Sequence, residues 1–334
     1  MPRIIDDAVV GRVLPPAAAV AAVETAFDLL AAGAAQDRPR ERSSAGGVTL
    51  NVMSAIAPTL DAVAVKSYPV VRSGTNRASV ITILVYGHRT GELRALLQGD
   101  LLGRSRTAAA SAVATRAMAR PDSSTVCVFG TGFQAPAQVT ALAEVLPKLD
   151  TVLVVGRTAE RAEATARALR DAHPRLRVES GTSPERAVPQ ADVVVTATGA
   201  SEPLFDGALL RPGTHVNAVG SNAAGRRELD ATVFRRAAHV VVDSVEVART
   251  ECGDLLANGL DPAEATAFAS VQAGRVPGRT HPDDITVYES HGLALQDLVC
   301  AVRVIDAAAA ADLGTTVHPE SWAPLPTDVR GANE

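Results

Sequence analysis

Hydrophobic and polar positions follow two different periods along the first part of the chain. Apolar residues recur every three or four positions over 17–35, an alanine-rich stretch preceded by prolines, which predicts an amphipathic helix. Short β-rich runs follow one another over 48–98, and this meander predicts an antiparallel sheet. A run of small residues over 100–119 predicts a further helix, which ends before Pro121.

The middle of the chain changes to buried strands separated by helix-length segments. A mainly apolar run ends at Phe129 and leads into Gly130, Gly132 and Ala135, which have the G-x-G-x-x-G/A spacing of a dinucleotide-binding turn. In such turns the first glycine permits the tight bend and the second lets a pyrophosphate approach the backbone, while the small third residue lets the helix pack on the strand. A second strand at 151–155 completes the βαβ unit that this interpretation requires.

The alternation of strands and helices continues toward the C-terminus. Further β-rich runs lie at 187–199, 213–220, 238–244 and 285–288. Strands separated in this way predict a doubly wound parallel sheet, and the loops 196–198 and 217–221 at its carboxyl edge should face a cofactor.

A long helix is predicted over 289–314, and it should cross back to the first part of the chain. The tail at 318–334 contains three prolines and is expected to be irregular. The predicted fold class is therefore α/β, with a Rossmann doubly wound dinucleotide-binding domain over 121–299. An α+β domain with a mainly antiparallel sheet should form from 1–120 together with 300–334.

Composition narrows the function classes. The chain has 334 residues, 47% of them hydrophobic, and a net charge of −5, which favours a folded globular protein. No basic run indicates a nucleic-acid partner, and no uninterrupted apolar core near the N-terminus indicates an export signal or a membrane span.

The number and spacing of the cysteines indicate the redox environment of the protein. Cys127, Cys252 and Cys300 form no C-x-x-C pair, so neither a metal site nor a disulfide framework is expected, and a reducing cytoplasm fits. Cys252 stands beside Glu251 with no activating cation in view, so a reactive thiol is not favoured.

The residues after the second strand of the βαβ unit select the cofactor. A carboxylate there would bind the ribose 2′-OH of NAD, but Gly156, Arg157 and Thr158 offer an arginine and a hydroxyl suited to a 2′-phosphate. NADP is therefore favoured, and NAD remains possible.

Four cations outside this unit are candidate ligands for an anion. Arg40 and Arg42 lie two apart, so an extended backbone would point both to one side, whereas a solvated arginine-rich loop is the alternative. Lys66 interrupts an apolar strand, and sequence alone favours a lysine that snorkels to solvent over one that binds an anion or moves a proton. Arg106, at the front of its helix, could bind a carboxylate or be exposed.

Several blocks, in order, resemble the ornithine cyclodeaminase and mu-crystallin family over nearly the whole chain. They are VKSYP around Lys66, TGELRALLQGDLLGRSRTAAASAVA around Arg106, the GTGFQA turn, VNAVGS followed by RELD, and SHGLALQDL near the end. The resemblance implies a homodimer whose first domain, completed by the C-terminal helix, supplies the dimer sheet and the substrate pocket. It also implies that the middle of the chain binds NAD(P).

The resemblance further implies roles for the candidate residues. Arg40, or less favourably Arg42, should hold the carboxylate of an amino or imino acid together with Arg106 and Lys66, and Lys66 should also be catalytic by moving a proton. The residues expected to contact the cofactor are Thr107, Gly130, Thr131, Gly132, Gln134, Ala135, Gly156, Arg157, Thr158, Arg161, Thr196, Ala197, Thr198, Val219, Ser221 and Gly292.

One position departs from the cyclodeaminase pattern. Cyclodeaminases of the family place an aspartate two residues after Val-Gly, where this chain has Asn222, and an amide cannot act as a carboxylate base. The resemblance therefore favours an NADP-dependent reductase of cyclic ketimines such as 1-pyrroline-2-carboxylate or 1-piperideine-2-carboxylate. Ornithine cyclodeaminase and an alanine-type amino-acid dehydrogenase are the rival enzymes, and a non-catalytic NADPH-binding protein like mu-crystallin is a further alternative.

Overall fold

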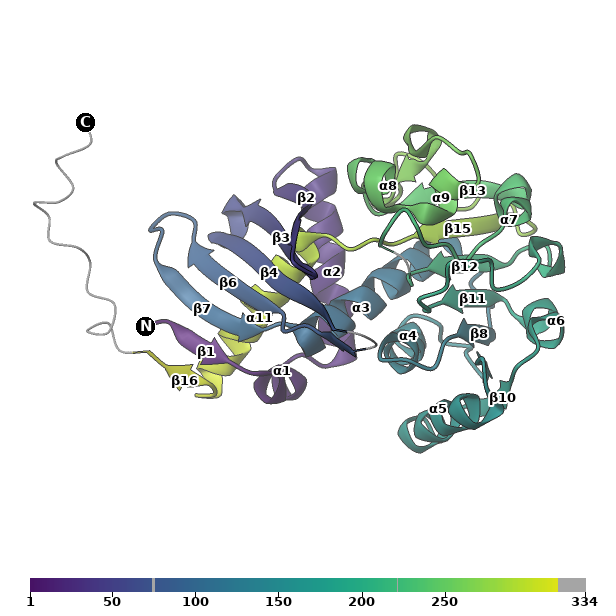
Figure 1. The fold of residues 1–334 in the computed structure, drawn as a ribbon, viewed down its shortest axis with the longest axis horizontal. Coiled ribbons are helices and arrows are strands. Elements are labelled where there is room, and N and C mark those ends of the chain that lie inside the picture. Colours follow the sequence, from purple (N-terminus) through teal and green to yellow (C-terminus); the bar gives the residue numbers. More distant parts are fainter. Residues whose placement is uncertain (74–75, 221, 318–334) are drawn as a thin grey trace, which may run out of the picture.

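Two sheets form the framework of the protein. The computed structural model describes residues 1–73, 76–220 and 222–317. Figure 1 shows one sheet at the left and the other at the right, with helix α3 (Asp100–Met118) lying between them. The predicted irregular tail at 318–334 lies outside the described residues.

The first sheet is the predicted meander. Its strand order is β16-β1-β7-β6-β4-β3-β2, with β5 paired to β4. The strands are β1 Arg3–Ile5, β2 Gln36–Ala45, β3 Val48–Ala57, β4 Ala62–Ser73, β5 Asn76–Ala78, β6 Thr82–Gly87, β7 Leu93–Gln98 and β16 Thr315–Thr316. All pairings are antiparallel except that of β1 with β7, so the mainly antiparallel sheet is confirmed.

One face of this sheet carries the core because side chains alternate along its strands. Met53, Ala55 and Ala57 of β3 are buried, and Met53 lies opposite Lys66 of β4, which therefore also points into the interior. Helix α11 (Ala294–Ala310) lies against β3 and β4 on this face. The expected return of the last helix to the first sheet is thus confirmed.

The second sheet is a doubly wound parallel sheet of order β10-β9-β8-β11-β12-β15-β13-β14. Its strands are β8 Thr125–Phe129, β9 Thr151–Val155, β10 Arg177–Gly181, β11 Val193–Thr196, β12 His215–Ala218, β13 Ala237–Val242, β14 Thr266–Ala267 and β15 Ile285–Glu289. The order reverses between β8 and β11, and such a switch point places a ligand crevice at the carboxyl ends of those two strands.

Eleven α-helices accompany the two sheets in the described residues. Besides α3 and α11 they are α1 Asp7–Val13, α2 Pro16–Ala31, α4 Gln134–Ala143, α5 Ala159–Ala172, α6 Pro184–Ala187, α7 Ala231–Arg236, α8 Val245–Glu251, α9 Gly253–Ala257 and α10 Phe268–Gln272. In the described ranges no single helix is long and apolar enough to cross a membrane. Taken together, α1 and α2 meet the length and composition required, but they are bent by 91° at the break between them.

Three aromatic rings connect helix α2 to strand β15 of the parallel sheet. The ring of Phe27 in α2 packs edge-on against Phe268 of α10, with centroids 4.6 Å apart, and Phe268 packs against Tyr288 of β15 at 5.4 Å. All three side chains are fully buried. Aromatic pairs in this geometry add to the stabilisation from buried area.

Replacing Phe268 by alanine removes the central ring of this contact. We expect Phe268→Ala to lower the free energy of unfolding by about 3–5 kcal/mol, because a fully buried aromatic side chain leaves a cavity. Urea denaturation followed by circular dichroism measures the change. The exposed Val80 is the control, since Val80→Ala should change the free energy of unfolding by no more than about 0.5 kcal/mol.

Candidate active site

A pocket of about 550 Å³ opens at the switch point of the parallel sheet. Of the residues expected to contact a cofactor, it is lined by Gly130, Thr131, Gly132, Gly156, Arg157, Thr158, Arg161, Ala197 and Thr198. The carboxyl ends of β8, β9 and β11 thus meet where a doubly wound sheet places a dinucleotide.

The glycine turn after β8 has the backbone that a dinucleotide requires. Gly130 has φ +118°, and a Cβ there would lie 2.5 Å from the carbonyl oxygen of Ala197, so only glycine fits. A Cβ at Gly132 would meet no described atom within 4 Å, which leaves open space beside the backbone. The amide groups at the start of α4 therefore have room for a pyrophosphate.

A second cationic part of the pocket lies after β9. Thr158 caps α5, and its hydroxyl accepts a hydrogen bond from the Arg161 amide at 3.4 Å. Arg157 and Arg161 are exposed at the pocket wall. Two guanidinium groups and a helix N-terminus at one edge suit an anionic group such as a phosphate.

Other residues expected to contact a cofactor do not line this pocket. Thr107, Gln134, Ala135, Thr196, Val219 and Gly292 lie outside its wall, and Ser221 lies outside the described residues. The hydroxyl of Thr196 donates to Glu228 at 2.8 Å, and the amide of Gly220 donates to the same carboxylate at 2.9 Å. Glu228 also accepts hydrogen bonds from Thr198, which lines the pocket, so this carboxylate joins the loop after β12 to the pocket wall.

A second site is built around Lys66, whose side chain is 3% exposed. Its Nζ donates to both carboxylate oxygens of Asp297 in α11, each at 3.0 Å. Arg106, also buried, donates from Nε to Asp297 Oδ1 at 3.2 Å and from Nη1 to Gln296 at 3.3 Å. The interpretations of Lys66 as a snorkelling lysine and of Arg106 as an exposed residue are wrong, because both cations have a buried anionic partner.

Burial and charge set the ionisation of this group. Burial lowers the pKa of Lys66 from 10.5 to about 8, an effect that Asp297 opposes and Arg106 reinforces. For Asp297, burial raises the pKa, but the charges of Arg106 and Lys66 outweigh it and lower the pKa overall. A lysine that titrates near neutral pH can hold an anion and also release a proton.

The loop between β15 and α11 is shaped to approach Arg106. Gly292 has φ +84°, and a Cβ there would lie 2.5 Å from Nη1 of Arg106. The amides of His291 and Gly292 both donate to the carboxylate of Asp243 at 2.7 Å. Asp243 therefore fixes the backbone that covers the Arg106 guanidinium group.

The two arginines of β2 share one acid from helix α8 of the Rossmann unit. Arg40 is buried and pairs with Glu251 in α8, and it donates to the carbonyl oxygen of His291 at 3.3 Å. Arg42 is more exposed and pairs with the other oxygen of Glu251 at 2.9 Å. The extended backbone that would align the two side chains is confirmed, and the solvated loop is wrong.

Comparison with known proteins identifies the family of the chain. Residues 6–312 match the ornithine cyclodeaminase/mu-crystallin family. The chain belongs to that family. A Delta(1)-pyrroline-2-carboxylate reductase of Bacillus cereus is 34% identical over 81% of this chain and 85% of the relative, and ketimine reductase mu-crystallin of Mus musculus is 34% identical over 77% and 80%.

A solved structure gives the same fold. Delta(1)-pyrroline-2-carboxylate reductase of Thermococcus litoralis, in complex with NADH and L-proline, has a TM-score of 0.89 and 28% identity. The similarity covers 94% of this chain and all of that one. The Rossmann and antiparallel sheets of the present chain are therefore those of the ornithine cyclodeaminase/mu-crystallin family.

Three carboxylates belong to the site but were not predicted from the sequence. Asp297 lies inside the SHGLALQDL block, and Glu251 precedes Cys252, but neither position has a spacing that indicates a buried cation partner. Asp243 belongs to the predicted strand at 238–244, but the structure places it just after β13, where its carboxylate accepts from two backbone amides. The signal that could have found Asp297 is an acid in the first turn of an otherwise apolar helix.

Replacing Asp297 measures how much the stability of the fold depends on its pairing with the buried cations. We expect Asp297→Ala to lower the free energy of unfolding by about 3–5 kcal/mol, because Lys66 and Arg106 would remain buried beside no counter-charge. Chemical denaturation at neutral pH gives the value. Asp306→Ala is the matched control on the same helix: its partner Arg94 is half-exposed, so less than about 1 kcal/mol should be lost.

Proposed function

We propose that the protein is an NAD(P)H-dependent reductase of a cyclic ketimine carboxylate, of the 1-pyrroline-2-carboxylate or 1-piperideine-2-carboxylate type. The observation that carries this proposal is the convergence of Lys66 and Arg106 on one carboxylate, that of Asp297. Two buried cations that already hold a carboxylate are suited to the carboxylate of a substrate. The names of the Bacillus and mouse relatives and the NADH and proline bound by the Thermococcus enzyme support the same reaction class.

Each side chain has a separate task in this reaction. Arg106 uses Nε and Nη1 to hold Asp297 and Gln296, so its guanidinium plane is fixed before a substrate arrives. Lys66 lies beside it and supplies the proton that the imine nitrogen needs on reduction. A dihydronicotinamide cofactor held in the pocket at the end of β8 would supply the hydride. Fixing the substrate carboxylate holds the imine carbon in one orientation for the transfer.

Arg40 acts in this proposal mainly through its position. Its guanidinium group is committed to Glu251 and to the His291 carbonyl. Together with Arg106 it lowers the pKa of Lys66 electrostatically. Arg40 therefore places a positive charge near the substrate carboxylate. A direct bond between Arg40 and that carboxylate requires Glu251 to give up part of its pairing with Arg40.

We assign NADP(H) as the preferred cofactor within the nicotinamide dinucleotides. The support is the position of Arg157, Thr158 and Arg161 at the pocket edge after β9, and none of the described residues that line this pocket is an acid. An adenosine 2′-phosphate would meet two guanidinium groups and the N-terminus of α5 there.

Replacing Arg157 tests this preference. Arg157→Ser should weaken NADPH binding by roughly ten- to hundredfold, the value of a charge-assisted contact, and leave NADH binding nearly unchanged. Fluorescence titration of the reduced cofactors gives both dissociation constants. Arg175→Ser, an exposed arginine beyond α5, serves as the control for a lost surface charge. Equal weakening of both cofactors would contradict the assignment.

Ornithine cyclodeaminase is the second candidate. Asn222 occupies the position where the family resemblance places the acid of the cyclodeaminase reaction. The Asn222 side chain is exposed, and the backbone carbonyl oxygen of Asn222 accepts a hydrogen bond from Arg42 at 2.8 Å. An alanine-type dehydrogenase and a non-catalytic NADPH-binding protein are further alternatives, and the buried Lys66 and Arg106 favour catalysis over binding alone.

The remaining proposals concern the oligomeric state, the substrate partner and the cellular location of the enzyme. We propose a homodimer in which the first sheet supplies the contact, because Val48, Leu50 and Val71 on paired strands β3 and β4 are exposed apolar residues. The partner at the active site is a small amino or imino acid. A cytoplasmic location rests on the isolated cysteines of the sequence.

The reaction and the role of Lys66 are tested together by its pH dependence. The purified protein should oxidise NADPH with 1-pyrroline-2-carboxylate, and kcat/KM should fall as pH rises through about 8, since Lys66 loses its proton there. Lys66→Met should reduce kcat/KM about a hundredfold to ten-thousandfold while NADPH still binds. In Asp297→Asn the alkaline fall should begin at lower pH, because Asp297 raises the pKa of Lys66.

Ornithine with NAD provides the opposing assay. Ammonia release from ornithine by the native chain, without imine-dependent oxidation of NADPH, would overturn the proposal. Ammonia release by Asn222→Asp but not by the native chain would support the proposal that Asn222 prevents the cyclodeaminase reaction. An unchanged rate in Lys66→Met would remove Lys66 from the mechanism.

A further inference from the structure

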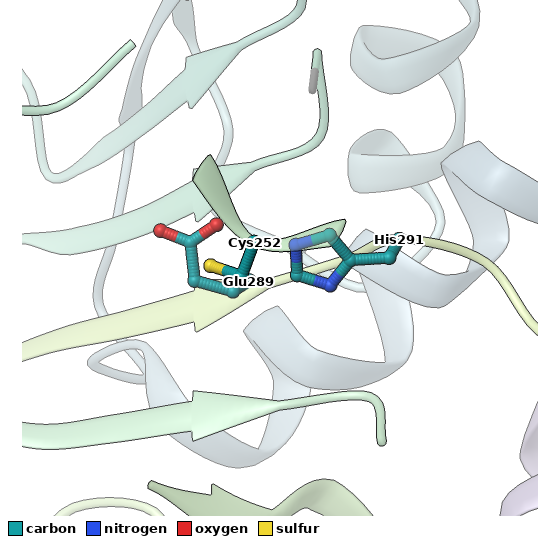
Figure 2. A group of neighbouring side chains, drawn as sticks. All are labelled: Cys252, Glu289 and His291. Atoms are coloured by element: carbon teal, nitrogen blue, oxygen red, sulfur yellow. The ribbon is translucent and has the colours of Figure 1, made fainter. Parts of the chain in front are cut away.

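Three buried side chains of different chemistry meet at the carboxyl end of β15. They are Cys252, which joins α8 to α9, Glu289, the last residue of β15, and His291 in the loop that follows. One ligand atom from each lies within 4.8 Å of the others, as Figure 2 shows for the thiol, the carboxylate and the imidazole ring. None of the three is used in the proposed reaction.

Polar atoms in this cluster lack partners. Oε1 of Glu289 is buried and has no hydrogen bond within the described residues, although the side chain is only 2% exposed. Nδ1 of His291 also lacks a hydrogen bond of good geometry, and it lies 3.5 Å from Oδ1 of Asp243. A buried unpaired carboxylate oxygen is costly, so a ligand that satisfies it would stabilise the fold.

The surroundings are rich in carboxylates. Glu228, Asp243 and Asp254 all lie near enough to Glu289 to disfavour its charge. Glu228 and Asp254 are themselves held by hydroxyl and amide donors. A divalent cation would offset this accumulation of buried negative charge.

We propose that Cys252, Glu289 and His291 bind one zinc ion. Thiolate, imidazole and carboxylate are the three ligand types that zinc takes in proteins, and a fourth position would remain for water. Because Nδ1 of His291 lies toward Asp243, Nε2 is the nitrogen left for the metal, and Asp243 would orient the ring as a carboxylate does in many zinc sites. Binding displaces the thiol proton of Cys252 and the carboxyl proton of Glu289 to solvent.

The ion would act on the substrate site through the backbone. Cys252 follows Glu251, which pairs with Arg40 and Arg42, and His291 precedes Gly292, which lies against Arg106. A metal joining Cys252 to His291 would therefore fix both segments that position these arginines. The role is structural and stands apart from the reaction assigned above.

The first test measures metal in the full-length protein. After growth with zinc and dialysis against buffer, elemental analysis should find about one zinc ion per chain. Cobalt-exchanged protein should show a thiolate-to-cobalt charge-transfer band in the near ultraviolet, which reports on sulfur ligation independently of activity. A chain without bound zinc and without the cobalt band after reconstitution would overturn the proposal, and Glu289 would then be a neutral acid beside the Cys252 thiol.

Variants assign the ligands. Cys252→Ser and His291→Gln should each remove the bound zinc, and Cys252→Ser should abolish the cobalt band. Cys127→Ser is the matched control, because Cys127 in β8 is equally buried but lies outside the cluster. If Cys252→Ser does not fold, His291→Gln and the cobalt spectrum of the unmodified chain still decide the question. Zinc and the cobalt band retained in both variants would contradict the site, whatever their reductase activity.

Discussion

The carboxylate of Asp297 holds two buried cations that come from separate elements, Lys66 on β4 and Arg106 on α3. Within this group of three residues, one carboxylate faces two cations. Burying a cation is expensive unless an anion joins it. In the proposed reaction the substrate carboxylate adds a second negative charge to this group, and the packing of α11 against the sheet depends on the same ion pairs.

A second ionic contact ties this site to the Rossmann unit. Glu251 of α8 reaches both Arg40 and Arg42 of β2, and the His291 carbonyl accepts from Arg40. The buried rings of Phe27, Phe268 and Tyr288 form an apolar counterpart to these contacts. Charged and apolar contacts together hold the dinucleotide pocket and the cations at a set separation, which hydride transfer between two bound molecules requires.

Local patterns revealed most of the fold and less of the site. The glycine turn and the apolar strands were predictable because their signals lie within a few residues of one another. The strand β10 was missed because its sequence, RVESG, is polar and lies at a sheet edge. The burial of Lys66 could not be inferred, since its partner Asp297 lies 231 residues away in sequence. The meeting of Cys252, Glu289 and His291 likewise depends on three segments that only the parallel sheet brings together.

The first and last described strands lie in the same sheet, because β1 pairs with β16, and α11 covers β3 and β4 of that sheet. During synthesis the meander emerges first, but its apolar face and Lys66 stay uncovered until residue 310 has been made. The Rossmann strands are complete by Glu289, so that unit can close earlier. The half of the protein that leaves the ribosome first is thus the half that finishes folding last, and it depends on prompt synthesis of the final helix to avoid aggregation.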